Sequence, residues 1–107
     1  MRQIRPTELK SWLDDNNRTA PVLLDVREPN EFAYCRIEGS LPMPMATVPS
    51  RCAELDAAAP VVVICHHGGR SAQVAMFLER QGFSEVINLA GGVAAWAGEI
   101  DPAMPRY

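Results

Sequence analysis

Cysteines, long apolar runs and charge of a single sign are all scarce in this chain of 107 residues. The three cysteines, Cys35, Cys52 and Cys65, are an odd number without C-x-x-C spacing, which argues against a disulfide framework and a structural zinc site. The longest apolar run, residues 57–65, is far too short to span a bilayer, and the first ten residues lack the apolar segment of a signal peptide. We therefore expect a cytoplasmic protein with reduced thiols.

The balance of charge argues against large polyanions as partners. Ten Lys and Arg residues stand against thirteen Asp and Glu residues, which gives a net charge of -3 at pH 7. Such a chain has no global field that attracts nucleic acid or an anionic membrane surface, so we expect neither as a partner. The composition, 48% hydrophobic and 21% charged, is that of an ordinary globular protein, and the length fits one domain over residues 1–107.

Short stretches typical of β-strands alternate with helical patterns along the chain. We expect strands at 3–4, 22–25, 40–43, 61–65 and 86–89. Between the strands we expect a helix capped by Thr7 that ends near Leu13, a helix that starts at Pro29, and a short helix with Val48, Cys52 and Leu55 on one face. A further helix should run from about 71 to 81 and stop at Gly82, and a last helix should hold Trp96. This alternation predicts an α/β domain with a largely parallel sheet.

One edge of such a sheet should hold the ligand site. Parallel strands joined by right-handed crossovers all end at the same edge, and ligands bind outside their carboxyl ends. Cys65, Asp25, Arg27 and the pair Gly91-Gly92 each follow a strand and should gather there. Cys35 follows a helix that should have returned to the opposite edge, so we expect it to be a poor second thiol for chemistry at Cys65.

The residues CHHGGRS at 65–71 have the composition of an anion-binding loop. A short loop directly before a helix aims backbone N–H groups and the helix dipole at whatever sits on the sulfur. Two glycines, Gly68 and Gly69, permit the required turn, Arg70 adds a fixed cation, and Ser71 is placed to cap the helix. In such surroundings the pKa of a thiol, about 8.5, can fall by several units. Cys65 is therefore predicted to be a nucleophilic thiolate near neutral pH.

Four motifs occur in a fixed order along the chain: DVRE at 25–28, EFAYCRIEGS at 31–40, C-x-x-G-x-R-S at 65–71 after a strand rich in Val and Ile, and LAGGVAAW at 89–96. Together they resemble the rhodanese family of sulfurtransferases over essentially the whole chain. The resemblance implies a three-layer α/β/α fold with a five-stranded parallel sheet and helices on both faces.

The resemblance also implies a reaction. In that family a cysteine accepts a sulfane sulfur as a persulfide and passes it to a nucleophilic acceptor, and this role falls to Cys65. The expected donor is thiosulfate or a persulfide, and the expected acceptor is a thiol, cyanide or a sulfur-carrier protein. No cofactor or metal is expected, and the chain is expected to be a monomer or a weak dimer. The residues expected to bind substrate are His66, His67, Gly68, Gly69, Arg70, Ser71 and Arg27.

The chain departs from the family pattern in two places, at Arg36 and in the pair His66-His67. Arg36 stands where the middle motif usually has histidine, in a region we expect to be structural. His66 and His67 occupy positions where related loops can carry fixed cations, and titratable imidazoles give less permanent positive charge at pH 7. Attraction of thiosulfate is therefore expected to be weaker and to depend on pH.

Other interpretations remain open at this point. Phosphatases and arsenate reductases of the same fold have five residues between cysteine and arginine, whereas this chain has four, which favours a single sulfur over a tetrahedral oxyanion. A binding module that uses the fold without turnover is the alternative from another class. Arg70 could contact substrate or bond loop carbonyls, Asp25 is expected to brace neighbouring backbone, and Arg27 is expected at the rim of the site.

Overall fold

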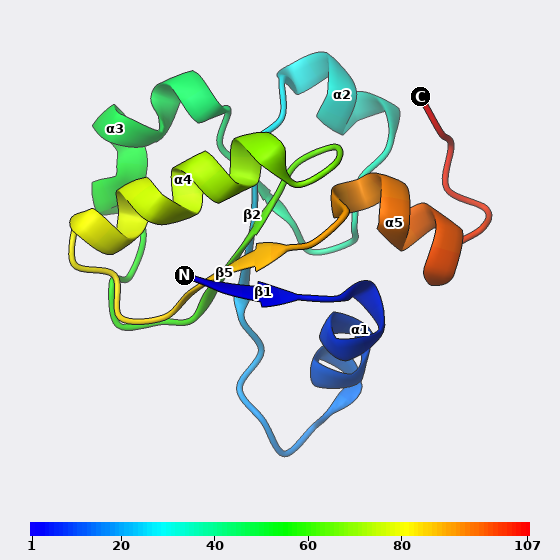
Figure 1. Cartoon of the computed structure of the whole chain (residues 1–107), viewed down its shortest axis with the longest axis horizontal. Helices are drawn as coiled ribbons and strands as arrows, with labels where there is room; N and C mark the ends of the chain where they lie inside the picture. Colours follow the sequence, from blue (N-terminus) through cyan, green and yellow to red (C-terminus); the bar gives the residue numbers. More distant parts are fainter.

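A computed structural model describes all 107 residues and contains one sheet of five parallel strands in the order β1-β5-β4-β2-β3. The five-stranded parallel sheet predicted from the sequence is confirmed. The strands, of which Figure 1 labels β1, β2 and β5, are β1 (Arg2–Ile4), β2 (Val22–Asp25), β3 (Leu41–Pro42), β4 (Val61–Ile64) and β5 (Val86–Leu89). Because β4 ends at Ile64, Cys65 is the first residue beyond the central strand.

Five helices surround the sheet: α1 (Pro6–Asp14), α2 (Pro29–Tyr34), α3 (Val48–Arg51), α4 (Gly69–Arg80) and α5 (Gly92–Glu99), with 3-10 turns at Met45–Thr47 and Cys52–Glu54. Figure 1 shows α3 and α4 together on one side of the molecule and α1 and α5 on the other. None of these helices is both long and apolar enough to cross a membrane.

Two helix ends test the expected capping residues. The expectation of Thr7 as a cap is wrong, because α1 already starts at Pro6, a residue suited to the first helical position, and the Glu8 carboxylate accepts the N–H of Arg5. The expected stop of α4 at Gly82 is confirmed. This glycine has φ +94°, and the N–H of Phe83 bonds back to the carbonyl of Leu78 at 3.1 Å.

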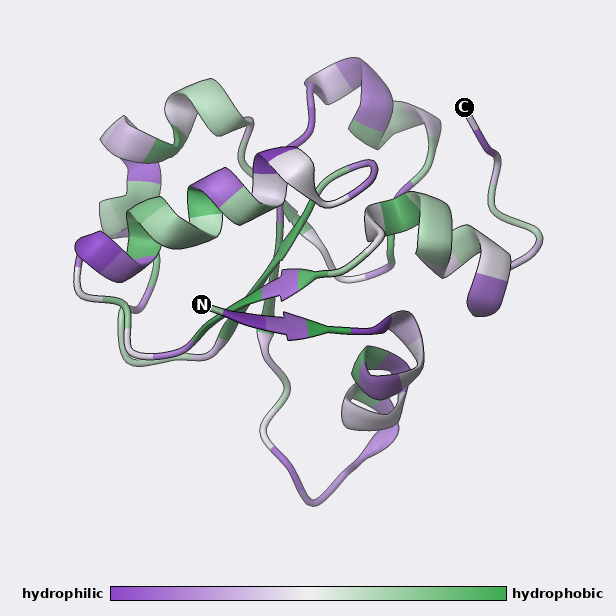
Figure 2. Ribbon diagram, in the orientation of Figure 1, coloured by the Kyte–Doolittle hydropathy of each residue, from purple (hydrophilic) through white to green (hydrophobic).

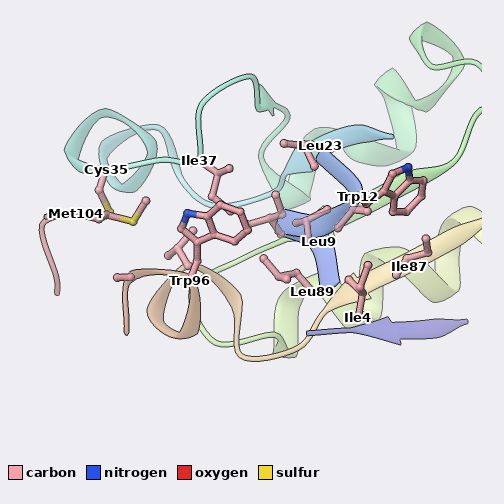
Figure 3. Close-up of a cluster of buried hydrophobic side chains, with 14 residues drawn as sticks. Ile4, Leu9, Trp12, Leu23, Cys35, Ile37, Ile87, Leu89, Trp96 and Met104 are labelled. Atoms are coloured by element: carbon pink, nitrogen blue, oxygen red, sulfur yellow. The ribbon is translucent and has the colours of Figure 1, made fainter. Parts of the chain in front are cut away.

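The central strand divides the core into two layers. Val61 and Val63 pack with α3 and α4, whereas Val62 and Ile64 face the opposite cluster under α1 and α5, and all four are fully buried. Figure 3 shows the second cluster, where Trp96 of α5 lies beside residues of α1 and β5. In Figure 2 the central strand β4 is hydrophobic, β5 is hydrophobic except for one hydrophilic segment, and the edge strand β1 is largely hydrophilic. The three-layer arrangement therefore follows from strands that are apolar on both faces.

The start of α5 holds the backbone that follows β4. The N–H of Val93 donates to the carbonyl of Cys65 at 2.9 Å, and the N–H of Ala94 donates to the carbonyl of His66 at 3.0 Å. This close approach requires glycine at position 92, where φ is +58° and a Cβ would overlap with both of those carbonyls. The first turn of α5 thus fixes the direction of the chain at Cys65.

Substitution Gly92→Ala should therefore destabilise the fold by more than about 2 kcal/mol, because it adds a side chain at a left-handed residue against backbone that cannot move aside. Urea denaturation followed by circular dichroism measures the change. Gly98→Ala, in the same helix with open space around it, is the matched control and should leave stability unchanged or raise it by up to about 1 kcal/mol. Equal stability of the two variants would contradict this account of Gly92.

Candidate active site around Cys65

Cys65 lies between the end of β4 and the start of α4, and only 1% of its surface is exposed. Its Sγ accepts the N–H of Gly68 at 3.0 Å and lies 3.2 Å from Oγ of Ser71. Residues 65–70, named here the Cys65 loop, thus fold back around their own sulfur. Both polar contacts come from groups of no net charge.

The conformation of Gly68 makes this geometry possible. Its φ of +107° is left-handed, and the residue serves as the N-cap of α4, so the helix begins at Gly69. The expectation that Ser71 caps the helix is therefore wrong. The first residue of α4, Gly69, lies two residues before Ser71. This serine is therefore inside the first turn of the helix, fully buried, with its hydroxyl beside the sulfur of Cys65.

The surroundings favour the thiolate over the thiol. Burial raises the pKa of Cys65, but hydrogen bonds at the sulfur, those from the backbone N–H groups of Ser71, Gly68 and His67 among them, lower it, and the net effect is a lowered pKa. The sulfur is therefore ionised at a lower pH than an ordinary thiol, as a nucleophile at neutral pH requires.

Arg70 is held by a carboxylate from another helix. Its guanidinium binds Glu31 of α2 with two bonds, of 2.7 and 3.0 Å. The Arg70 hydrogen bond lowers the pKa of Glu31 to about 2, so the pair stays ionised at neutral pH. The sequence suggested that Arg70 contacts substrate or bonds to loop carbonyls, and neither alternative foresaw its ion pair with Glu31. Glu31 is a site residue that the sequence did not single out.

Arg27 does not lie at the rim of the site, and the expectation that placed it there is wrong. Its side chain is fully buried, because Asp25 accepts its Nε at 3.0 Å and its Nη2 at 2.7 Å. The same carboxylate accepts the backbone N–H of Arg27 at 3.1 Å. Asp25 thus braces the chain after β2, as expected. It also neutralises the positive charge of Arg27, which is therefore not free to bind an anionic substrate.

Tyr107 packs against the Cys65 loop, and nothing in the sequence pattern pointed to it. Its ring stacks on the imidazole of His66, with centroids 3.9 Å apart and planes 9° from parallel. Its hydroxyl accepts from Arg27 Nη1 at 2.9 Å and donates to Glu31 at 2.8 Å. The imidazole of His67 also lies next to that of His66, with 3.9 Å between the two ring centroids. Burial and the nearby imidazole of His67 lower the pKa of His66, so it is neutral at pH 7.

Cys35 does not lie at the far edge of the sheet, which corrects the expectation from the sequence. Helix α2 has only six residues, and Arg27 Nη2 donates to the Cys35 carbonyl at 2.7 Å, so the chain has not run back when it reaches this cysteine. Cys35 and His66 both line a cavity of about 120 Å³ beside Tyr107. Figure 3 shows Cys35 near Met104 at one end of the hydrophobic cluster. Cys65 does not line this cavity.

The expected loop residues are therefore brought together in part. Cys65, Gly68 and Ser71 share hydrogen bonds, and Gly69 begins α4, whereas Arg70 is paired with Glu31 and His66 is stacked under Tyr107. No group of three His, Cys, Asp or Glu side chains in the structure is arranged to hold a metal ion.

Comparison with known proteins places this geometry in context. A family model described as "Rhodanese-like domain" matches residues 5–99. The "Probable adenylyltransferase/sulfurtransferase MoeZ" of Mycobacterium tuberculosis is 36% identical over 106 residues, which are 97% of this chain and 26% of MoeZ. The "Thiosulfate sulfurtransferase GlpE" of Stutzerimonas stutzeri is 40% identical over 75 residues, which are 70% of this chain and 69% of GlpE.

A solved structure shows the same similarity in three dimensions. The rhodanese-like domain protein of Staphylococcus aureus superposes with a TM-score of 0.85 at 29% identity, over 100% of this chain and 99% of that chain. By contrast, the chain spans only about a quarter of MoeZ, at 26% of its length.

The lowered pKa of Cys65 predicts how its reactivity changes with pH. The rate of alkylation by iodoacetamide, located at Cys65 by mass spectrometry, should reach half its maximum below pH 8.5, the value of an ordinary thiol. The shape of the profile carries the information, because burial slows the absolute rate at every pH. Cys65→Ser reports labelling of the other two cysteines. A midpoint at or above 8.5 would contradict the stabilised thiolate.

Proposed function

This chain belongs to the family of rhodanese-like domains, and from that premise we propose that it is a sulfurtransferase that carries a sulfane sulfur on Cys65. The observation that supports the proposal most strongly is the arrangement at the end of β4, where the Gly68 N–H and the Ser71 hydroxyl converge on a buried sulfur. Backbone N–H groups of this kind stabilise a negative charge on sulfur without a fixed cation.

The first half of the proposed reaction loads the enzyme. The Cys65 thiolate attacks the outer, sulfane sulfur of the donor, and a new S–S bond forms at Sγ. The S–S bond of the donor breaks, and its electron pair leaves with sulfite, if the donor is thiosulfate, or with a thiolate, if the donor is a persulfide. Cys65 then carries a persulfide whose outer sulfur holds the negative charge.

The second half unloads it. A nucleophilic acceptor attacks the outer sulfur, the bond between that sulfur and Sγ breaks, and the electron pair returns to Cys65. The acceptor is cyanide in the test tube and a thiol or a sulfur-carrier protein in the cell. Because the enzyme is covalently modified between the two halves, the kinetics are ping-pong. The similarity to GlpE, a thiosulfate sulfurtransferase, supports thiosulfate as one donor.

Charge around the loop bears on the choice of donor. Arg70 is neutralised by Glu31, Arg27 is buried with Asp25, and the His66 imidazole is neutral at pH 7. The proposed site therefore lacks a free fixed cation next to the sulfur, and a doubly charged anion such as thiosulfate gains little attraction there. We propose that the loop residues His66, His67, Gly68, Gly69 and Arg70 bind the donor chiefly through backbone N–H groups.

Mass spectrometry tests the proposal directly. After incubation with thiosulfate or glutathione persulfide and removal of the donor, the intact protein should gain the mass of one sulfur atom, located at Cys65. Cys65→Ser should gain none, and Cys52→Ser, which removes a cysteine whose hydrogen bond goes to the Pro49 carbonyl and not to the loop, should behave like the unchanged protein. Absence of the added sulfur with every donor would favour a binding module without turnover.

A charge substitution tests the neutralisation of Arg70. Glu31→Gln keeps the shape of the side chain but frees the guanidinium, so the KM for thiosulfate should fall by about fivefold at low salt, and high salt should erase the gain. Steady-state assays with cyanide as acceptor measure it. Glu85→Gln removes an equal charge before β5 and serves as the control. An unchanged KM in Glu31→Gln would mean that Arg70 takes no part in donor binding.

A further inference from the structure

Asn88 of β5 is a buried polar residue next to the proposed nucleophile, and neither half of the reaction above uses it. Only 3% of its surface is exposed. Its Nδ2 donates to the carbonyl of Gly68 at 3.2 Å and to Oε1 of Gln3 at 2.9 Å. Its Oδ1 accepts the hydroxyl of Ser71, the same hydroxyl that contacts Cys65. The side-chain amide thus has a partner at both ends.

The partners fix which way the amide points. The Gly68 carbonyl can only accept a hydrogen bond, so the atom of Asn88 beside it must be the NH₂ group. The oxygen is then the atom that faces Ser71, and an amide oxygen can only accept. It follows that the single hydroxyl hydrogen of Ser71 points at Asn88 rather than at the sulfur.

This direction has a consequence for Cys65. While Ser71 donates to Asn88, its oxygen offers the sulfur a lone pair, which suits a protonated thiol that donates S–H. A thiolate needs the opposite, a hydroxyl that donates to sulfur. Ser71 can supply this only by breaking its bond to Asn88, which leaves a buried amide oxygen without a donor. Asn88 and the thiolate therefore compete for one hydrogen.

We propose that Asn88 is a positioning residue that holds the Ser71 hydrogen away from Cys65 and so sets how readily the sulfur ionises and how readily it departs as a leaving group. Its effect on turnover rests on the function proposed above, whereas its effect on ionisation does not. A thiolate that is less stabilised is a stronger nucleophile but a poorer leaving group. Asn88 thus balances the two halves of a reaction in which Cys65 is first the attacking group and then the departing one.

The other charged and titratable groups around the thiol are left in place by this test. Those on the Cys65 loop and on the elements packed around it are His66, His67, Arg70, Asp25, Arg27, Glu31 and Tyr107. None of them bonds to Asn88 or Gln3, so a substitution at either position removes no charge, and only a substitution at Asn88 changes the hydrogen bonds of Ser71.

The experiment measures the pH profile of Cys65 alkylation in the full chain carrying Asn88→Leu, a substitution of similar size that removes the acceptor. Ser71 is then free to donate to the thiolate, and the pKa of Cys65 should fall by about one unit. Asn88→Ala should shift it in the same direction and serves if the leucine variant does not fold. Gln3→Ala, which leaves the Gly68 carbonyl to orient the amide, should cause no shift.

The same substitutions in a Ser71→Ala background complete the cycle. Because the proposed effect acts through the Ser71 hydroxyl, Asn88→Leu should cause no fall in pKa there. A merely structural role for Asn88 predicts the opposite sign, since loss of the bond to the Gly68 carbonyl would loosen the N–H that holds the sulfur and raise the pKa. A rise, no change, or a fall that persists without Ser71 would overturn the proposal. Failure to load sulfur would count against the proposed function alone.

Discussion

The whole site depends on one constraint, the direction of the peptide groups that follow β4. The carbonyls of Cys65 and His66 are bound by the first N–H groups of α5, so they face away from the sulfur, and the N–H of Gly68 is left to face it. Gly92 lets α5 come close enough to make those bonds. The buried central strand fixes where this assembly stands, and the stabilisation of negative charge on sulfur follows from backbone dipoles already held in place.

The two arginines at the Cys65 loop, Arg27 and Arg70, are placed as if to bind an anion, but they support the structure instead. Arg27 lies close to the Cys65 loop and Arg70 is its last residue, yet each is bound to a carboxylate of its own, Asp25 and Glu31. Tyr107 links the two pairs through its hydroxyl and covers His66 with its ring. These contacts join the chain after β2, helix α2 and residue 107 to the Cys65 loop. Ionic groups thus support the loop as a framework, while neutral groups contact the sulfur.

The fold and the position of the thiol could be predicted from the sequence because they depend on local patterns. Apolar runs that end on Gly, Asp or Cys define parallel strands, and a glycine-rich loop before a helix defines an anion site. The roles of Ser71, Arg27 and Cys35 could not, since each depends on where a neighbour lies: one left-handed glycine shifts the start of α4, one carboxylate buries a guanidinium, and one short helix stops early. Partners distant in sequence, such as Tyr107 and Asn88, leave no local signal.

A single-turnover transfer tests whether Cys65 carries sulfur between two separate reactions. Protein loaded with a sulfane donor is freed of all donor and then mixed with cyanide, and the thiocyanate released is measured against the amount of protein. We expect one equivalent per chain from the unchanged protein and none from Cys65→Ser. Thiocyanate that forms only while donor and acceptor are present together would contradict a persulfide held on Cys65.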